Sequence, residues 1–418
     1  MASIWERLKR LFGKKLRSLF RRSLEFPVSF PTTGWEILPA DKKLEEEQMP
    51  RYLEDTCYCH FIMGDILLSR YQIVGKLGWG TTSVVWLVRD LERNDYMALK
   101  VFALDVLGSE ESAYYDRIEQ GNQQHLGSDR VRTKIGELKI PRNDGWKHLG
   151  LLQTPLGESL LDIQNRSADE RLDKPTIKST IYQMLLALDY LHTECKFIHG
   201  DIKGDNIFQE IGDKTRLERY VQAEIENPTP RKIVVRHPVY RSRPLEPASQ
   251  LGKLQLGDFG SAEPGDVPRN GQPLQPNFYR APEVMLKKEW NYPAWRAFEG
   301  SPLFTCRKDG GAYSTSVHLA QITGLLGPPP PDFIEPDTVS AKYFDQDGNW
   351  ISEDCEVNTT SFEDLENHLE GEDKEMFLDL MKGIITWRPE DRKTPKELIE
   401  HPWLQGVFWP PGLYKPTE

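Results

Sequence analysis

Cysteine is scarce in this sequence, and long apolar runs are missing from it. Five cysteines are scattered along 418 residues. An odd number without regular spacing argues against a disulfide framework and indicates a reducing compartment. Cys57 and Cys59 lack a second Cys/His pair at ligand spacing, so a zinc site is not expected. No run of about eighteen apolar residues occurs, so the sequence predicts no transmembrane helix.

Charge is unevenly distributed along the chain. The net charge is −11, although residues 1–24 hold eight Lys/Arg against one acid, Glu6. The remaining chain is therefore strongly acidic, which disfavours direct binding of nucleic acid and favours basic partners.

Residues 1–25 predict a basic amphipathic helix, because apolar residues recur at helical spacing between the basic ones. Three interpretations stay open. The helix lies on an anionic membrane surface, acts as an organelle presequence, or is a tail without a targeting role. The expected location is cytoplasmic, nuclear or both, with organelle targeting as the alternative.

The order of the sequence patterns predicts one α+β domain with two lobes. Prolines between residues 26 and 70 indicate an extended arm. A helix is expected at 110–120 and another at 177–192. These patterns divide the chain into a β-rich lobe at 71–156 and a helical lobe at 157–410. The β-rich runs are Tyr71–Leu77, Ser83–Val88, Tyr96–Phe102 and His148–Leu152.

A glycine-rich hairpin opens the β-rich lobe. Glycine lets backbone N–H groups approach phosphate oxygens without a Cβ in the way. The motif therefore predicts a cradle for nucleotide phosphates, although Ser83 stands where a third glycine would be expected. The residues of this candidate cradle are Leu77, Gly78, Trp79, Gly80, Thr81, Thr82, Ser83, Val84 and Val85.

Ala98 and Lys100 lie on the following strand, at the spacing of a lysine that pairs with the α- and β-phosphates. Glu111 in the next helix is the candidate ion-pair partner of Lys100. We choose Glu111 over Glu110 because the helical face of Glu111 also carries Tyr115.

The segment from His199 to Asn206 carries the residue types of a phosphoryl-transfer centre. A carboxylate must orient the incoming hydroxyl and accept its proton, which is the role expected of Asp201. Lys203 is the expected contact of the transferred phosphoryl group, and Asn206 is the expected amide ligand of Mg²⁺. Their order and spacing make this motif far more specific than the glycine-rich hairpin.

Asp258 begins the triplet Asp-Phe-Gly and follows a short apolar stretch, as a metal-binding carboxylate at a strand end should. Ala281–Glu283 then ends the segment that begins at Asp258, and this segment has an ordinary length. A buried Glu283 needs a cation, and we expect Arg392 to supply it.

Taken together, these motifs resemble those of the SR-protein kinase (SRPK) family, and in particular the short fungal SRPK-like serine/threonine kinases. The resemblance covers roughly residues 26–405. Further stretches that carry it are Phe30–Gly34, Glu45–Glu47, Pro155–Gly157, Pro230–Lys232, Tyr240–Pro244, Gln275–Arg280, Leu325–Pro329 and His401–Leu404.

The resemblance implies a bilobal protein-kinase fold with a spacer insert at 209–253. It implies an ATP-dependent, non-specific serine/threonine protein kinase that uses ATP and Mg²⁺ and acts on protein substrates, and we expect a monomer. Arg/Ser-rich substrates are implied by the family alone. The segment comparable to the family's acidic docking surface, Gly311–His318, contains no acid.

Gly200 replaces the arginine that usually precedes the catalytic Asp and grips a phosphate on the activation segment. Between Gly260 and Ala281 the only hydroxyl residues are Ser261 and Tyr279. The two absences agree, so we expect an activity that does not depend on phosphorylation of this segment.

The stretch from Pro293 to Gly300 departs from the family. Related kinases continue here with a long hydrophobic helix that scaffolds the catalytic loop, whereas this stretch allows only about 9 Å of helix at about 1.5 Å per residue. The helix is therefore expected to be truncated, through an omission in the gene model or in a true variant. The alternative function is a catalytically impaired, pseudokinase-like binding scaffold. A small-molecule kinase is disfavoured, because Ala281–Glu283 suits a peptide-binding platform.

Overall fold

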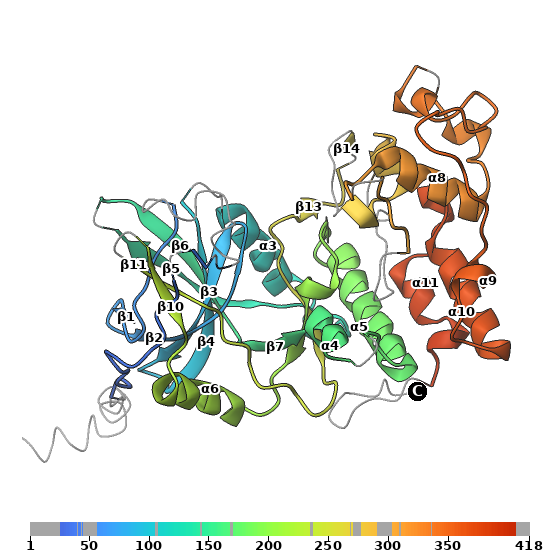
Figure 1. The fold of residues 1–418 in the computed structure, drawn as a ribbon. Coiled ribbons are helices and arrows are strands. Elements are labelled where there is room, and N and C mark those ends of the chain that lie inside the picture. Colours follow the sequence, from blue (N-terminus) through green and yellow to red (C-terminus); the bar gives the residue numbers. More distant parts are fainter. Residues whose placement is uncertain are drawn as a thin grey trace, which may run out of the picture. The chain divides into compact units, whose positions relative to one another are not determined.

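The computed structural model describes most of the chain as two compact units (Figure 1). The first unit contains residues from 1–109, 134–156 and 211–247, and the second contains residues from 110–133, 157–210 and 248–418. The described residues are 26–39, 41–42, 44, 57–104, 108–142, 144–167, 170–234, 237–267, 269–270, 277–290, 303–308, 311–335 and 337–406.

A six-stranded antiparallel sheet forms the first unit, in the order β1-β2-β3-β4-β6-β5. All four predicted strands are present, with ends that differ by a few residues. Strand β5 is not predicted from the sequence, because its inward-facing Leu138 and Ile140 give only a short alternation. The strands are β1 (Ile66–Leu67), β2 (Tyr71–Gly80), β3 (Ser83–Asp90), β4 (Asp95–Phe102), β5 (Lys134–Pro141) and β6 (Lys147–Gln153).

Alternation along β2 and β3 gives the sheet two apolar faces. Ile73 and Val88 lie in one core cluster, which also includes Tyr58 from the N-terminal arm. Their neighbours Val74 and Leu87 lie in a second cluster on the other face. Both faces are therefore covered, and part of the cover comes from segments distant in sequence.

The insert in the catalytic loop supplies much of this cover. It contains α6 (Thr215–Glu226) and a hairpin of β10 (Arg231–Val234) and β11 (His237–Tyr240). Helix α6 packs its buried face, with Leu217, Tyr220 and Val221, against β2 and β3. Residues 211–247 thus fold as part of the first unit.

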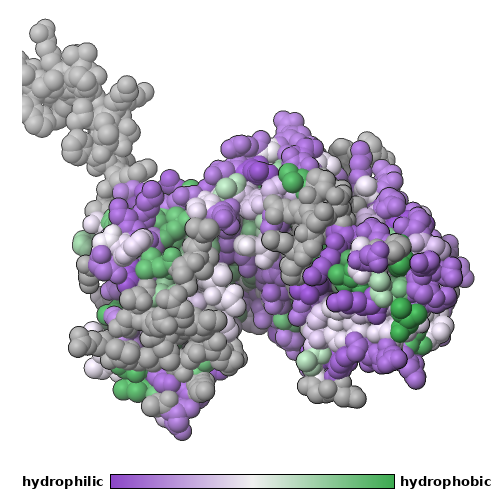
Figure 2. All heavy atoms as spheres, turned by 90° about the horizontal axis from the view of Figure 1, so that it is seen from above, coloured by the Kyte–Doolittle hydropathy of each residue, from purple (hydrophilic) through white to green (hydrophobic). Residues whose placement is uncertain are grey.

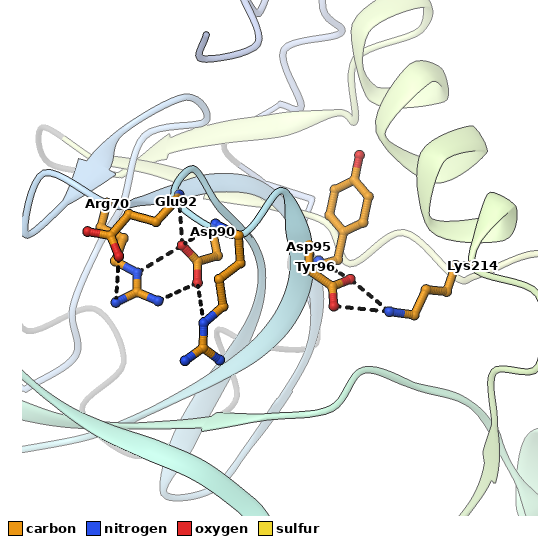
Figure 3. Close-up of polar contacts among 7 residues, drawn as sticks. Arg70, Asp90, Glu92, Asp95, Tyr96 and Lys214 are labelled. Carbon is orange, nitrogen blue, oxygen red and sulfur yellow. Dashed lines mark hydrogen bonds and ion pairs between the residues drawn. The ribbon is translucent and has the colours of Figure 1, made fainter. Parts of the chain in front are cut away.

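Ion pairs and hydrogen bonds join residues at the ends of the sheet strands and at the start of α6 (Figure 3). Arg70 donates to both carboxylate oxygens of the buried Asp90, over 2.8 and 2.6 Å, and its guanidinium also pairs with Glu92. At the start of α6, Lys214 reaches both oxygens of Asp95 at 3.0 Å. Lys214 and Asp95 are exposed, so the packing of α6 depends chiefly on its apolar face.

The second unit is mainly helical and contains small two- and three-stranded sheets, β12-β9-β7, β13-β8 and β14-β15. Its strands are β7 (Leu156–Ser159), β8 (Phe197–Ile198), β9 (Ile207–Glu210), β12 (Leu254–Leu256), β13 (Glu263–Pro264), β14 (Arg269–Asn270) and β15 (Glu289–Trp290). Its helices are α3 (Gly108–Gln120, from Glu110 on), α4 (Leu160–Arg166), α5 (Lys174–Thr193), α7 (Pro282–Met285), α8 (Thr315–Leu326), α9 (Phe362–Leu365), α10 (Gly371–Ile384) and α11 (Pro395–Ile399).

Helix α5 is the longest described helix and is buried along most of its length. Asp173 caps its N-terminus by accepting a hydrogen bond from the backbone N–H of Thr176 at 2.9 Å. Met184 and Leu185 have no exposed surface. The predicted helix at 177–192 is confirmed within this longer element.

The predicted pair of Glu283 and Arg392 is confirmed. Both guanidinium N–H groups of Arg392 donate to the carboxylate of Glu283 over 2.6 Å, and both residues are buried. The pair joins α7, which follows the activation segment, to the loop before α11. Removing one partner would leave a buried charge uncompensated.

Three sequence-based predictions fall outside the described residues. They are the amphipathic helix at 1–25, the acidic stretch Glu45–Glu47 and the truncated helix at Pro293–Gly300. In the part of the chain that the structure describes, no helix combines the length and apolar character needed to cross a membrane. Hydrophilic residues dominate the described surface in Figure 2, with small separate apolar patches.

Gly75 gives a direct test of the packing of α6. A Cβ at this position of β2 would lie 2.2 Å from Cε1 of Tyr220. Gly75→Ala should therefore lower the stability of the first unit by about 1–3 kcal/mol, measured as a fall in the thermal unfolding midpoint. In a Tyr220→Ala background, which removes the clashing ring, Gly75→Ala should lower the midpoint by less than it does in wild type, because the two changes are coupled. An unchanged midpoint for Gly75→Ala would show that α6 does not pack here.

His192 gives a pH test of the second unit. Burial in α5 lowers the pKa of His192 from 6.5 to about 3. The folded state thus favours the neutral imidazole. The free energy of unfolding therefore has its full value above about pH 6.5 and decreases as the pH drops below it. Between pH 7 and pH 5 the loss from this group should be about 2 kcal/mol. Urea unfolding of His192→Met should show a weaker loss over this range; an equal loss would contradict the burial.

Candidate active site

The glycine-rich hairpin occupies the end of β2, a two-residue turn at Thr81 and Thr82, and the start of β3. Gly78 pairs with Val85 and Gly80 pairs with Ser83. A Cβ added to either glycine would meet nothing within 4 Å. Internal packing therefore does not require glycine at these two positions, and the open space above the backbone fits a phosphate cradle.

The tip of the hairpin is anchored by groups that the sequence analysis did not identify. Tyr58 donates its hydroxyl to the carbonyl of Thr81 at 2.9 Å, and the N–H of Ala103 donates to the carbonyl of Thr82 at 2.9 Å. The two bonds hold the turn from the arm and from the residue that follows β4. Tyr58 lies far from the motif in sequence, so no local pattern could reveal it.

The hairpin continues directly into the strand that carries Lys100. Val85 pairs with Lys100 and Leu87 pairs with Ala98 across β3 and β4. Lys100 is buried, and its ammonium lies 5.2 Å from the ring centroid of Phe102. Lys100 belongs to the first unit and Glu111 to the second, so their ion pair stays a prediction.

In the second unit, the catalytic loop brings Asp201, Lys203 and Asn206 together. Asn206 donates through Nδ2 to the backbone carbonyl of Asp201 at 2.7 Å and to its Oδ2 at 2.9 Å. The Lys203 ammonium lies 3.2 Å from the same Oδ2. Both of these contacts reach Oδ2, so Oδ1 is the oxygen that could accept a hydrogen bond from a substrate hydroxyl.

Gly200 and His199 set the backbone before Asp201. Gly200 has a φ of +77°, a left-handed conformation that glycine adopts without strain. The N–H of Asp201 donates to Nδ1 of His199 at 3.2 Å, so the proton of this neutral ring is on Nε2, which donates to the carbonyl of Gly257 at 2.9 Å. Burial lowers the pKa of His199, which favours this neutral form.

Asp258 is placed next to the catalytic loop by an antiparallel strand pair. Strand β9 starts directly after Asn206, β12 ends at Leu256, and Ile207 pairs with Leu256. The N–H of Gly257 also donates to the carbonyl of Asn206 at 2.9 Å. Asn206 and Asp258 therefore lie at the same end of the pair, as two oxygen ligands of one metal site must.

Phe259 fixes the turn after Asp258. It is completely buried, and its ring packs edge-on against Tyr115 of α3 at 5.1 Å and Phe197 of β8 at 5.6 Å. His199 lies 5.1 Å from the same ring. Asp258 has a φ of +64°, a strained conformation that such close packing can hold.

Glu111 faces this cluster from α3. Glu111 is buried and Glu110 is exposed, as predicted from the helical face. Tyr115 donates its hydroxyl to Oε1 of Glu111 at 3.4 Å. An ideal Cβ at Gly260 would lie 3.4 Å from Oε2 of Glu111 and 3.5 Å from Oδ1 of Asp258. The two carboxylates thus converge on one point.

The residues of the second unit fit a magnesium ion. Both N–H bonds of the Asn206 amide are used within the loop, so its oxygen is the atom that can bind a metal. Together with the Asp258 carboxylate it forms a hard oxygen donor set, which Mg²⁺ completes with phosphate and water oxygens.

Comparison with known proteins agrees with this geometry. The family model for the protein kinase domain matches residues 71–295. A serine/threonine protein kinase of Aspergillus fumigatus is 36% identical over 93% of this chain and 98% of its own length. The serine/threonine-protein kinase SRPK of Physarum polycephalum is 28% identical over 84% of this chain and 89% of its own length.

Two further similarities are more distant or partial. SRSF protein kinase 3 of Sus scrofa is 35% identical over 45% of this chain and 33% of its own length. A crystal structure of a kinase domain matches 83% of this chain and 99% of its own with a TM-score of 0.62 at 22% identity, which supports the fold alone. Nothing in these comparisons supports the alternative of an impaired binding scaffold. The chain belongs to the protein kinase family and is a serine/threonine protein kinase with SRPK-like relatives.

Proposed function

We propose that this kinase transfers the γ-phosphoryl group of ATP to serine or threonine hydroxyls with Asp201 as the catalytic base. The observation that carries the proposal is the set of contacts at Oδ2 of Asp201, from Asn206 and Lys203. They fix the carboxylate while Oδ1 stays available. A base must lie within hydrogen-bond reach of the proton it accepts.

The proposed phosphoryl transfer needs no reactant other than ATP and the substrate hydroxyl. The substrate oxygen forms a bond to the γ-phosphorus as the bond from that phosphorus to the β–γ bridging oxygen breaks. The hydroxyl proton passes to Asp201, and ADP leaves. Lys203 is suited to contact the transferred phosphoryl group, because its ammonium is already beside the base.

ATP and Mg²⁺ are the proposed cofactors. The hairpin from Leu77 to Val85 and the lysine at 100 would hold the phosphates, with Ala98 on the same strand. Asn206 and Asp258 would hold the metal, and Glu111 would orient Lys100. Mg²⁺ bound there supplies charge neutralisation for the phosphates during transfer.

Basic proteins rich in Arg and Ser are the proposed substrates. The chain carries a net charge of −11, which attracts basic partners over long range. The names of the SRSF protein kinase relatives point to the same class. Gly311–His318 contributes no acid, so any acidic docking surface must come from other residues.

Replacing the proposed base tests this function. Asp201→Asn keeps the shape and loses the proton acceptor, so phosphate transfer to an Arg-Ser repeat peptide should fall by about 10²–10⁴-fold. Transfer is measured with labelled ATP, alongside a Ser-containing acidic peptide that should react more slowly. Stabilisation by Mg·ATP in a thermal unfolding assay should remain, because Asp201 is not assigned to the metal.

Glu210 offers a matched control carboxylate at the end of β9. It is paired with Lys253 at 3.2 Å and lies outside the proposed site. Glu210→Gln should keep the wild-type rate within about twofold. Equal rates for wild type and Asp201→Asn would refute the role of Asp201.

Activity should not require phosphorylation of the activation segment. Gly200 offers no cation to grip a phosphate, and its left-handed backbone makes an arginine there strained. Protein treated with a broad-specificity phosphatase should keep its rate on the Arg-Ser peptide, measured after the phosphatase is removed. A large loss that returns on re-phosphorylation would contradict this expectation.

A further inference from the structure

Arg132 is a basic residue of the second unit that none of the motifs above includes. It follows a short 3₁₀ turn, Ser128–Arg130, and runs beside the strand that leads to Asp258. Val131 forms a parallel bridge with Leu256, and the N–H of Arg132 donates to the carbonyl of Leu256 at 2.8 Å. The backbone of Arg132 is therefore fixed two residues from the proposed metal ligand.

The side chain of Arg132 crosses the backbone of Gly257. An ideal Cβ on Gly257 would lie 3.1 Å from Cδ and 3.4 Å from Cβ of Arg132, so the glycine leaves room for the arginine stem. The guanidinium carbon lies 5.7 Å from the ring centroid of Phe208 on β9, and Nε is shielded from solvent. Arg132 thus packs against Gly257, the residue that directly precedes the proposed metal ligand Asp258.

Two carboxylates lie near the turn that follows Gly257. Glu111 and Asp258 converge on one point near Gly260, as described above. Arg132 interacts electrostatically with both of them and with Tyr115. Two like charges held this close repel each other, and a fixed cation of the same unit offsets that repulsion.

Burial around the guanidinium lowers the pKa of Arg132, and the carboxylates of Asp258 and Glu111 act against this effect. The residue as a whole is partly exposed, while its Nε is shielded from solvent.

We propose that Arg132 is a positioning residue, the resident counter-charge that holds the carboxylates of Asp258 and Glu111 in place for the metal and nucleotide. The inference rests on the roles proposed above for Asp258 and Glu111. Arg132 acts through these two groups and is not itself assigned to contact with the reacting atoms.

The test compares Arg132→Met with Arg132→Lys in the full-length chain. Arg132→Met keeps the stem and removes the charge, so the rate on the Arg-Ser peptide should fall by about 10–100-fold. The Mg²⁺ concentration for half-maximal rate should rise, and high Mg²⁺ should recover part of the loss. Arg132→Lys should retain most of the rate.

Arg130→Met is the matched control. Arg130 is a buried neighbour whose guanidinium pairs with Asp129 at 2.9 Å, and in the described part of the chain neither Asp258 nor Glu111 is among its ion-pair partners. This variant should leave the rate and the Mg²⁺ dependence unchanged. Arg132→Met with wild-type rate and Mg²⁺ dependence would overturn the proposal, and so would Arg132→Lys as impaired as Arg132→Met.

A second readout separates this inference from the proposed function. The rise in unfolding midpoint caused by Mg·ADP needs no phosphate transfer, and it should be smaller in Arg132→Met than in wild type. If wild type transfers no phosphate but shows this difference, the proposed function fails and the role of Arg132 stands. If wild type is active and the Mg·ADP rise is equal in both proteins, the role of Arg132 fails alone.

Discussion

The short antiparallel pair of β9 and β12 is the constraint on which the catalytic half of the structure depends. Its register sets Ile207 against Leu256, and the bond from the N–H of Gly257 to the carbonyl of Asn206 closes the end. This pairing brings the two proposed oxygen ligands, Asn206 and Asp258, together although a long insert separates them in sequence. Loop-closure entropy grows only slowly with length, so such an insert is tolerated when the pair itself is well fixed. A bond from the N–H of Leu254 to the side chain of Gln183, at 2.8 Å, ties the pair to the long, largely buried helix α5.

Around this pair the backbone takes conformations that few residues adopt easily. Gly200 and Asp258 both have positive φ values, one before the proposed base and one at the proposed metal ligand. The ring of Phe259 and the imidazole of His199 pack against each other and hold both turns. Strain of this kind persists only where the surroundings determine it, and it is common at functional sites. The same region is tightly packed at Gly257, where a Cβ would lie 3.1 Å from Cδ of Arg132.

Much of the fold and most of the candidate site could be predicted from sequence, because the necessary signals are local. The apolar alternation of β2 to β4 is visible within single strands, and Asp201, Lys203 and Asn206 stand within one short loop. The face that selects Glu111 is a property of one helix. By contrast, the anchoring of Thr81 by Tyr58, and of β2 by α6, depends on segments that meet only in the folded chain. No sequence motif singles out Arg132. The role proposed for it depends on its neighbours Gly257, Asp258 and Glu111 in the folded chain, which are distant from it in sequence.

The most direct test of this account is the position of the metal. Crystals of the full chain with Mn²⁺ in place of Mg²⁺ and a non-hydrolysable ATP analogue would locate the ion by its anomalous scattering. The account predicts an ion bound by the amide oxygen of Asn206 and the carboxylate of Asp258, with phosphate oxygens completing the shell. An ion that contacts neither residue, with the nucleotide bound, would contradict the claim that β9 and β12 assemble the catalytic centre.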